Sequence, residues 1–268
     1  MNTASNILRV AALPLNIQWG NREANLDAVE VALKHLPLGT DVVVLPELFS
    51  TGYIDDAEQM RSLAERNTGA TIDRIKELAA HYSVAIAGSY LASTPPHIYN
   101  RGFFIEPSGE ETFYDKHHLF SRSNEGNVFR AGDESMPIVR FRGWNIAMII
   151  CYDLRFPVWC RSKENSYDML LVPANWPQAR AYAFEHLLIA RAIENQVVVV
   201  GANRGGSDKF GDFEGLTRIY DYLGQPVGTQ VGPFIMAEVS RTKQDEFRQR
   251  FPVSRDADDF TILDRNRY

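Results

Sequence analysis

Three residues with complementary chemistry each stand at the end of an apolar run. Cys151 follows IAMII, Glu47 follows VVVLP, and Lys116 ends the short stretch ETFYDK. Hydrolysis of an amide needs a nucleophile, a base that takes and returns a proton, and positive charge where an oxyanion develops. A thiol, a carboxylate and an ammonium group can supply these three functions if the fold brings them together.

Each of the three residues also has an ordinary structural interpretation. Free cysteine is among the residue types most often buried, so a lone Cys151 is more often a small core residue. Glu47 and Lys116, taken singly, are more often surface residues or one half of an ion pair. Their shared position at strand ends favours the chemical interpretation, because open α/β sheets bind ligands at the carboxyl ends of their strands.

Apolar, β-branched runs alternate with helical patterns along the chain, which predicts an α/β fold. Helices are predicted at 25–36, 70–82 and 181–196. Strands are predicted at 8–13, 41–45, 84–88, 102–105, 112–114, 146–150, 169–172 and 197–201. The segments 103–116 and 218–229 each combine strand, Gly-containing turn and strand, which predicts β-hairpins. The simplest arrangement is one domain over 1–268, with two mixed sheets between outer helices.

The composition limits the class of protein. The 268 residues are 45% hydrophobic and 23% charged, which is typical of a soluble globular protein. A net charge of −6 repels phosphate backbones and argues against nucleic acid as a partner. No apolar run approaches the roughly 20 residues that cross a bilayer, and the N-terminus lacks the charged region of a signal peptide. With only two cysteines and no disulfide scaffold, we expect a cytoplasmic protein with no membrane association.

Three segments, LPELFSTGY, YDKHHLF and CYDLRFP, occur in this order and resemble the signature segments of the nitrilase superfamily of carbon–nitrogen hydrolases. The resemblance covers nearly the whole chain. It implies an αββα sandwich, with Glu47, Lys116 and Cys151 as a Glu–Lys–Cys triad that needs no metal or organic cofactor. The later segments VPANWP, RAIENQ, GANRGGSD and RFPVSRDADDF are most similar to those of bacterial omega-amidases. That similarity implies a small substrate such as 2-oxoglutaramate or a related ω-amide of a 2-oxo acid, with water as the second reactant.

Two further positions are candidates for supporting the triad. Members of the superfamily often carry a second glutamate near the triad, and Glu125 in the loop after Lys116 matches it. It is expected to hold Lys116 in place, to assist proton transfer, or to be a plain solvated loop residue. The backbone N–H of Tyr152, next to the nucleophile, is a candidate oxyanion donor.

The substrate pocket is defined less sharply by the sequence. Arg155 is suited to bind a substrate carboxylate with two parallel hydrogen bonds, but an internal salt bridge explains it equally well. The resemblance implies that Asn175 and Trp176 line the pocket. Tyr53 and Phe120 are candidate pocket walls, although aromatic residues at such positions are more often plain core.

An anionic substrate requires local positive charge, because the chain as a whole is acidic. Lys116 is assigned to the reacting centre. The candidates that remain for a remote carboxylate are Arg155 and, with it, Arg180 or Arg204.

Other patterns point away from metals and nucleotides. His117 and His118 are adjacent, so on a strand they face opposite sides and do not jointly grip a metal. The glycines of GANRGGSD do not form a phosphate-binding loop. Cys160, beside Trp159 on a predicted helix, is interpreted as a packing residue.

The sequence leaves several alternative functions open. Another carboxylate-bearing amidase, an N-carbamoyl amino acid amidohydrolase and a true nitrilase share the triad. A non-catalytic binding protein on the same fold is the alternative from another class.

The resemblance also implies a homodimer or larger oligomer in which the C-terminal tail, about 251–268, crosses toward a neighbour. The tail mixes apolar anchors with acidic residues, which suits a docked segment.

Overall fold

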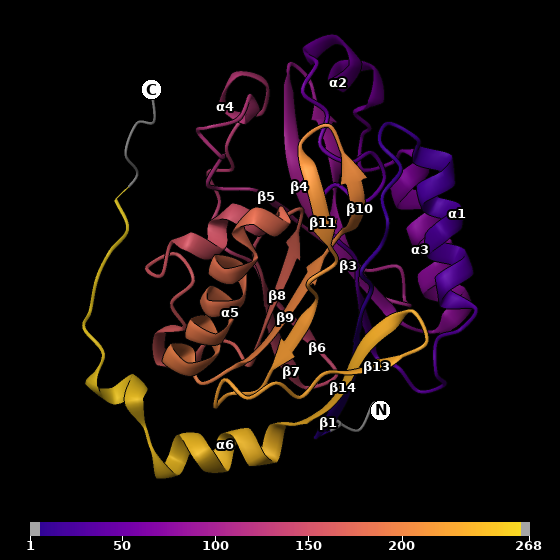
Figure 1. Cartoon of the computed structure of the whole chain (residues 1–268). Helices are drawn as coiled ribbons and strands as arrows, with labels where there is room; N and C mark the ends of the chain where they lie inside the picture. The colour runs from indigo at the N-terminus through magenta and orange to yellow at the C-terminus, as the bar shows by residue number, and fades with distance from the viewer. Residues whose placement is uncertain (1–5, 264–268) are drawn as a thin grey trace.

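Two mixed sheets with helices on their outer sides form the structure, a computed structural model that describes residues 6–263 (Figure 1). The first sheet has the order β13 (Thr229–Val231), β14 (Phe234–Ser240), β1 (Ile7–Ala12), β2 (Val42–Val44), β3 (Ala85–Thr94), β4 (His97–Ile105) and β5 (Glu111–Asp115). The second sheet has the order β12 (Arg218–Tyr220), β9 (Val198–Asn203), β8 (Met169–Ala174), β7 (Trp144–Met148) and β6 (Ile138–Phe141). The expected α/β fold is confirmed.

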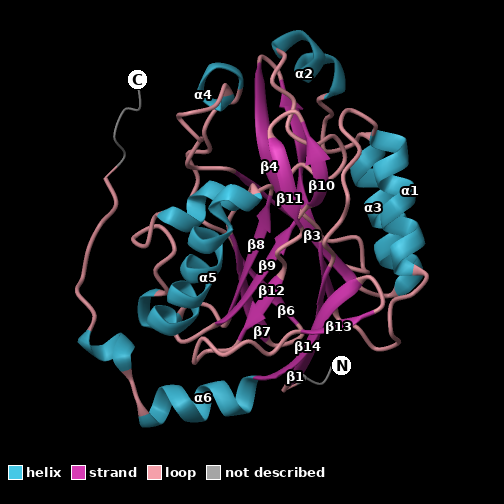
Figure 2. Ribbon diagram, in the orientation of Figure 1, coloured by secondary structure: helices cyan, strands magenta, loops and turns pink. Residues whose placement is uncertain are grey.

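The sheets pack against each other, and helices cover their outer faces (Figure 2). Val44 of β2 lies in the same buried apolar cluster as Met148 of β7 and Leu170 of β8. On the outer side of the first sheet lie α1 (Arg22–Leu33) and α3 (Ala70–Tyr82). On the outer side of the second lies α5 (Ala181–Asn195), whose Leu188 packs over β9. This layering is the αββα sandwich implied by the resemblance.

The helix periodicity located all three long helices, with differences at both ends of α1 and at the end of α5. α3 has the expected bounds, and α5 ends one residue early at Asn195. α1 begins at Arg22 because the side chain of Asn21 accepts the Ala24 N–H and caps the first turn. It ends at Leu33, so Leu36 lies beyond the helix.

Several short elements were missed or misplaced. The hairpin at 103–116 is confirmed as β4 paired with β5. The one at 218–229 is only partly correct, because β12 pairs mainly with β9 and meets the returning chain in one bridge, Tyr220 with Pro226. Cys160 lies in a turn and not on a helix, although it is fully buried as a packing residue. The sequence analysis did not predict the hairpin of β10 (Gly205–Asp208) and β11 (Gly211–Glu214), nor the short helices α2 (Ala57–Leu63) and α4 (Glu125–Val128).

The C-terminal region begins with α6 (Arg241–Arg250), which the sequence analysis also missed. Arg248 fixes this helix to the body by donating to the fully buried carboxylate of Asp168 at 2.9 Å. The chain then runs outside α5 as an extended tail (Figure 1). Residues 264–268 of the predicted tail and 1–5 of the predicted domain lie outside the described residues. None of the helices described between residues 6 and 263 combines the length and apolarity needed to span a membrane.

The contact between β9 and α5 depends on a glycine. A Cβ atom at Gly201 would lie 2.6 Å from Leu188 Cδ1, whereas one at Gly126 in α4 would meet nothing within 4 Å. We expect Gly201→Ala to lower the free energy of unfolding by about 1–3 kcal/mol through overpacking. Gly126→Ala, the matched control, should be neutral or slightly stabilising. Urea unfolding of both variants measures the difference, and equal midpoints would contradict this packing.

Candidate active site

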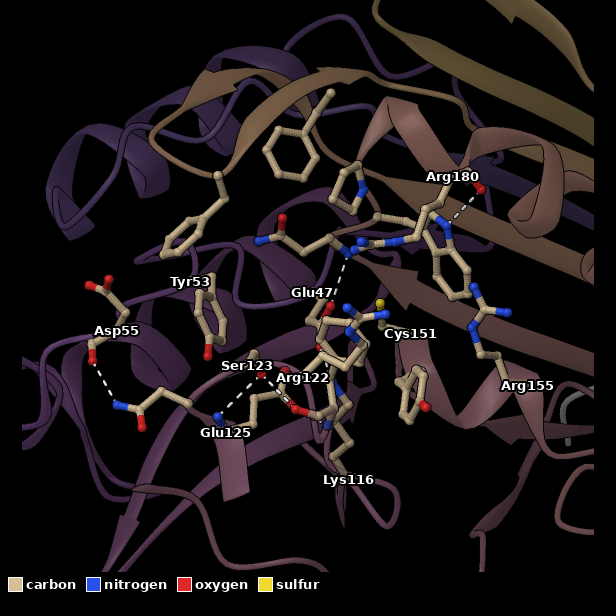
Figure 3. Close-up of a pocket in the computed structure, with 18 of the residues that line it drawn as sticks. Glu47, Tyr53, Asp55, Lys116, Arg122, Ser123, Glu125, Cys151, Arg155 and Arg180 are labelled. Carbon is tan, nitrogen blue, oxygen red and sulfur yellow. Dashed lines mark hydrogen bonds and ion pairs between the residues drawn. The ribbon is translucent and has the colours of Figure 1, made fainter. Parts of the chain in front are cut away.

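The three residues singled out in the sequence meet at the carboxyl ends of strands from both sheets. Glu47 follows β2, Lys116 directly follows β5, and Cys151 follows β7. All three are buried, with 3%, 1% and 8% of their surfaces exposed. Lys116 Nζ lies 2.8 Å from Glu47 Oε1. Figure 3 shows the thiol of Cys151 and the carboxylate of Glu47 facing the same cavity, with Lys116 beneath them.

The Glu47 carboxylate is held by three donors. Besides Lys116, the side chain of Asn100 donates to Oε1 at 2.7 Å, and the backbone N–H of Asn175 donates to Oε2 at 2.9 Å. Asn100 is itself oriented by Ser89 Oγ, which donates to its side-chain oxygen at 2.9 Å. The sequence analysis missed both residues. Ser89 had a signal, as a polar residue among the buried positions of β3, whereas Asn100 lies beside Arg101 in the more polar half of β4 and had none.

Glu125 holds Lys116 from the other side. Its Oε1 lies 3.1 Å from Lys116 Nζ, and its Oε2 accepts the backbone N–H of Phe120 at 2.8 Å. At 4% exposure it is a buried partner and not a solvated loop residue. Burial raises the pKa of Glu125 despite the opposing effect of Lys116. Burial by itself would lower the pKa of Lys116, but Glu125 and Glu47 outweigh it and raise that pKa well above its ordinary value.

Cys151 sits on a strained turn. Its φ of 43° lies in the left-handed region, which is costly for a residue with a side chain, and it begins a short 3₁₀ helix, Cys151–Arg155. Burial and then the Glu47 carboxylate raise the pKa of Cys151 well above its ordinary value, while Lys116 lowers it. This shift favours the protonated thiol over the thiolate.

The cluster opens into a cavity of about 430 Å³. The candidate pocket residues Tyr53, Phe120, Arg155, Asn175 and Trp176 line it, as does Tyr152, the candidate oxyanion donor. Trp176 is buried and its ring NH donates to the Arg180 carbonyl at 2.9 Å. Sequence reasoning missed several further lining residues: Asp55, Arg122, Phe210 and Phe213.

Three arginines border the cavity, and one expected arginine does not. Arg155 lies 4.8 Å over the Trp176 ring and Arg180 lies 5.3 Å over the Phe120 ring. Within residues 6–263, neither guanidinium nor that of Arg122 forms an ion pair. In that part of the chain, Arg155 therefore has no internal salt bridge. Arg204 as a substrate-binding residue is wrong, because its side chain is buried outside the cavity against Asp208 and the carbonyl of Ile17.

Two buried polar atoms of the cavity wall remain without a hydrogen-bond partner in the described chain. They are the hydroxyl of Tyr53, which lies beside Ser123, and the side-chain Nδ2 of Asn175. A buried polar group without a partner is costly, so such atoms in a cavity favour a ligand with matching polar groups.

The two histidines after Lys116 have separate partners. His117 Nδ1 lies 2.8 Å from the Gly132 carbonyl, and His118 Nδ1 lies 2.8 Å from the carboxylate of Asp153. Among residues 6–263 no cluster of His, Cys, Asp and Glu has the geometry to hold a metal ion.

Comparisons with known proteins agree with the fold and the site. The carbon–nitrogen hydrolase family matches residues 9–243. Omega-amidase YafV of Escherichia coli is 38% identical over 95% of this chain and 98% of its own, and the 2-oxoglutaramate amidase of Bacillus subtilis is 31% identical over 91% and 95%. The crystal structure of XC1258 from Xanthomonas campestris, a CN-hydrolase superfamily protein with an arsenic adduct in its active site, superimposes with a TM-score of 0.89. Its identity is 36%, over 96% of this chain and 99% of that one. The predicted resemblance is confirmed, and the chain belongs to the carbon–nitrogen hydrolase family.

Proposed function

We propose that this chain, an amidase by its family and relatives, hydrolyses a small ω-amide that carries a carboxylate at its far end. The favoured substrates are 2-oxoglutaramate and 2-oxosuccinamate, in line with the names of its relatives. The observation that carries the proposal is the buried ammonium of Lys116 between two carboxylates and beside a thiol. The cavity there is bordered by arginines that form no ion pair with residues 6–263.

The first half of the reaction forms a covalent intermediate. Glu47 takes the proton from the Cys151 thiol, and the thiolate attacks the amide carbon. The negative charge that develops on the carbonyl oxygen is stabilised by Lys116 and the backbone N–H of Tyr152. Glu47 then protonates the departing ammonia, and a thioester on Cys151 remains. The resting thiol is protonated, so a base next to it is required.

The second half returns the enzyme to its starting state. Glu47 takes a proton from a water molecule, which attacks the thioester carbon. The carbon–sulfur bond breaks, the thiolate regains the proton, and the acid leaves. Glu47 suits both halves because three donors fix its carboxylate beside the thiol.

The far end of the cavity supports recognition of an anion. Figure 3 shows Arg155 and Arg180 beyond Cys151, on the side opposite Tyr53 and Asp55. Both guanidiniums lie over aromatic rings, which leaves their N–H groups available for a carboxylate. Asn175 Nδ2 is a donor suited to a 2-oxo group or another polar group along the acyl chain.

Other functions differ in what the cavity must recognise. A nitrilase needs no remote charge, and an N-carbamoyl amino acid amidohydrolase places a ureido group at the thiol. A non-catalytic binding protein needs no reactive thiol. Labelling of Cys151 by iodoacetamide that an ω-amide slows would favour the enzyme, and ammonia release across amides, carbamoyl amino acids and nitriles separates the rest.

Recognition of the remote carboxylate predicts a substrate preference. We expect kcat/KM for 2-oxoglutaramate to exceed that for its methyl ester and for an uncharged amide of equal length. A charge-assisted contact is worth about 1.5–3 kcal/mol, so the expected difference is about 10- to 100-fold. Arg155→Met should remove most of this difference in kcat/KM. Arg140→Met, a control at an exposed position on β6, should leave the difference unchanged. Similar kcat/KM for all three amides would refute the omega-amidase assignment and leave the amidase class intact.

We also propose that the chain forms a homodimer or a larger oligomer. The tail after α6 exposes Phe251, Ile262 and Leu263, which is unfavourable unless a partner covers them. Light scattering at micromolar concentration should give at least twice the mass of the 30.3 kDa chain. A clean monomer would exclude this assembly. The cytoplasmic location stays a prediction.

A further inference from the structure

A buried carboxylate close to the proposed nucleophile has no role in the reaction described above. Asp153 is fully buried and does not line the cavity. Its Oδ2 accepts the backbone N–H of Ile150 at 3.1 Å, and its own N–H donates to the Ile150 carbonyl at 3.0 Å. These two bonds close a ring around Cys151, the residue with the left-handed φ. By itself this is an ordinary way to cap a short helix.

The same carboxylate also binds the chain segment that carries Lys116. The hydroxyl of Tyr114 donates to Oδ2 at 2.8 Å. The backbone N–H of His118 donates to Oδ1 at 2.8 Å, and its ring Nδ1 lies 2.8 Å from the same oxygen. Tyr114 and His118 stand on either side of Lys116 in the chain, so one carboxylate joins the two segments that present the ammonium and the thiol.

The donors to Asp153 are themselves fixed. The His118 ring stacks on Phe156 with centroids 3.6 Å apart, and the ring NH of Trp159 donates to the Tyr114 hydroxyl at 3.0 Å. Lys116 directs its own hydrogen bonds to Glu47 and Glu125, and therefore to groups other than the Cys151 turn. The hydrogen bonds that link the two segments therefore lie beside the site, at Asp153, next to ring contacts of His117 with Trp159 and of Phe120 with Tyr152.

We propose that Asp153, with Tyr114 and His118, is a positioning group that sets the separation between the Cys151 thiol and the Lys116 ammonium. The inference rests on the proposed roles of those two residues. A misplacement of about 1 Å can cost about 10² in rate. Because none of the three positioning residues lines the cavity, loosening them should lower kcat and leave KM nearly unchanged.

Tyrosine and histidine variants test the link without removing the buried carboxylate. Tyr114→Phe removes one donor to Asp153. Its matched control is Tyr167→Phe, which also removes a buried hydroxyl, one that donates to the Cys160 carbonyl. His118→Leu removes the ring donor, and His118→Asn restores an N–H near the position of Nδ1.

The readouts are KM and kcat, with kcat calculated per reactive Cys151. The reactive thiols are counted by titration, so that a partly unfolded fraction of the protein does not lower the measured kcat. We expect His118→Leu to lower kcat about 10- to 100-fold and Tyr114→Phe to lower it several-fold, with KM within about two-fold. His118→Asn should recover most of the loss, and Tyr167→Phe should match the wild type. If His118→Leu does not fold, Tyr114→Phe and His118→Asn still decide the question. Wild-type kcat in Tyr114→Phe and His118→Leu, or an equal loss in Tyr167→Phe, would overturn the proposal.

A second readout does not depend on the substrate. Lys116 favours the thiolate, so alkylation of Cys151 by iodoacetamide should slow in Tyr114→Phe and His118→Leu but not in Tyr167→Phe. An unchanged or faster alkylation rate would contradict the link. Failure of the wild type to release ammonia from any amide would instead refute the proposed function, while the alkylation rates would still test the positioning role.

Discussion

The ammonium group of Lys116, buried to 1% exposure between two carboxylates, is the interaction on which the site depends. Taking an ammonium ion out of water costs several kcal/mol, so the charge persists only if opposite charges meet it at hydrogen-bond distance. Glu47 and Glu125 do so. Burial of the site, and then the Glu47 carboxylate, raise the pKa of the Cys151 thiol, while Lys116 opposes the shift. In the proposed mechanism the thiol therefore needs the neighbouring carboxylate as its base.

The charged cluster also explains why two sheets are needed. The first sheet presents Glu47 and Lys116 at the ends of β2 and β5, and the second presents Cys151 after β7 and Asn175 after β8. The shared core between the sheets aligns these strand ends, and the backbone N–H of Asn175 reaches across to the Glu47 carboxylate. The carboxylate and the ammonium group therefore come from one sheet and the thiol from the other. In the proposed mechanism, small shifts between the layers would change the distance between the reacting groups.

Much of this arrangement was predictable from the sequence, and the remainder has identifiable causes. The buried strands β2 and β7 end in continuous apolar runs, so their ends, which Glu47 and Cys151 follow, can be located from the sequence. The three long helices follow from periodicity. Asn100 and Asp153 could not be assigned, because their partners are distant in sequence and only tertiary packing brings them together. The assignment of Arg204 to the substrate carboxylate was wrong for the same reason. Only the fold pairs its side chain with Asp208, outside the cavity. The left-handed φ of Cys151 is likewise imposed by its surroundings.

The central claim is that the chemistry passes through the Cys151 sulfur, and the chain contains its own control. Cys160 is also buried, and burial raises its pKa to about 12. Ammonia release from 2-oxoglutaramate should be measured for Cys151→Ala and Cys160→Ala, with circular dichroism to confirm that both fold. The account predicts that Cys151→Ala loses turnover by on the order of 10⁶-fold, as expected for loss of a covalent nucleophile, while Cys160→Ala stays close to the wild type. Near-wild-type turnover by a folded Cys151→Ala protein would contradict the account.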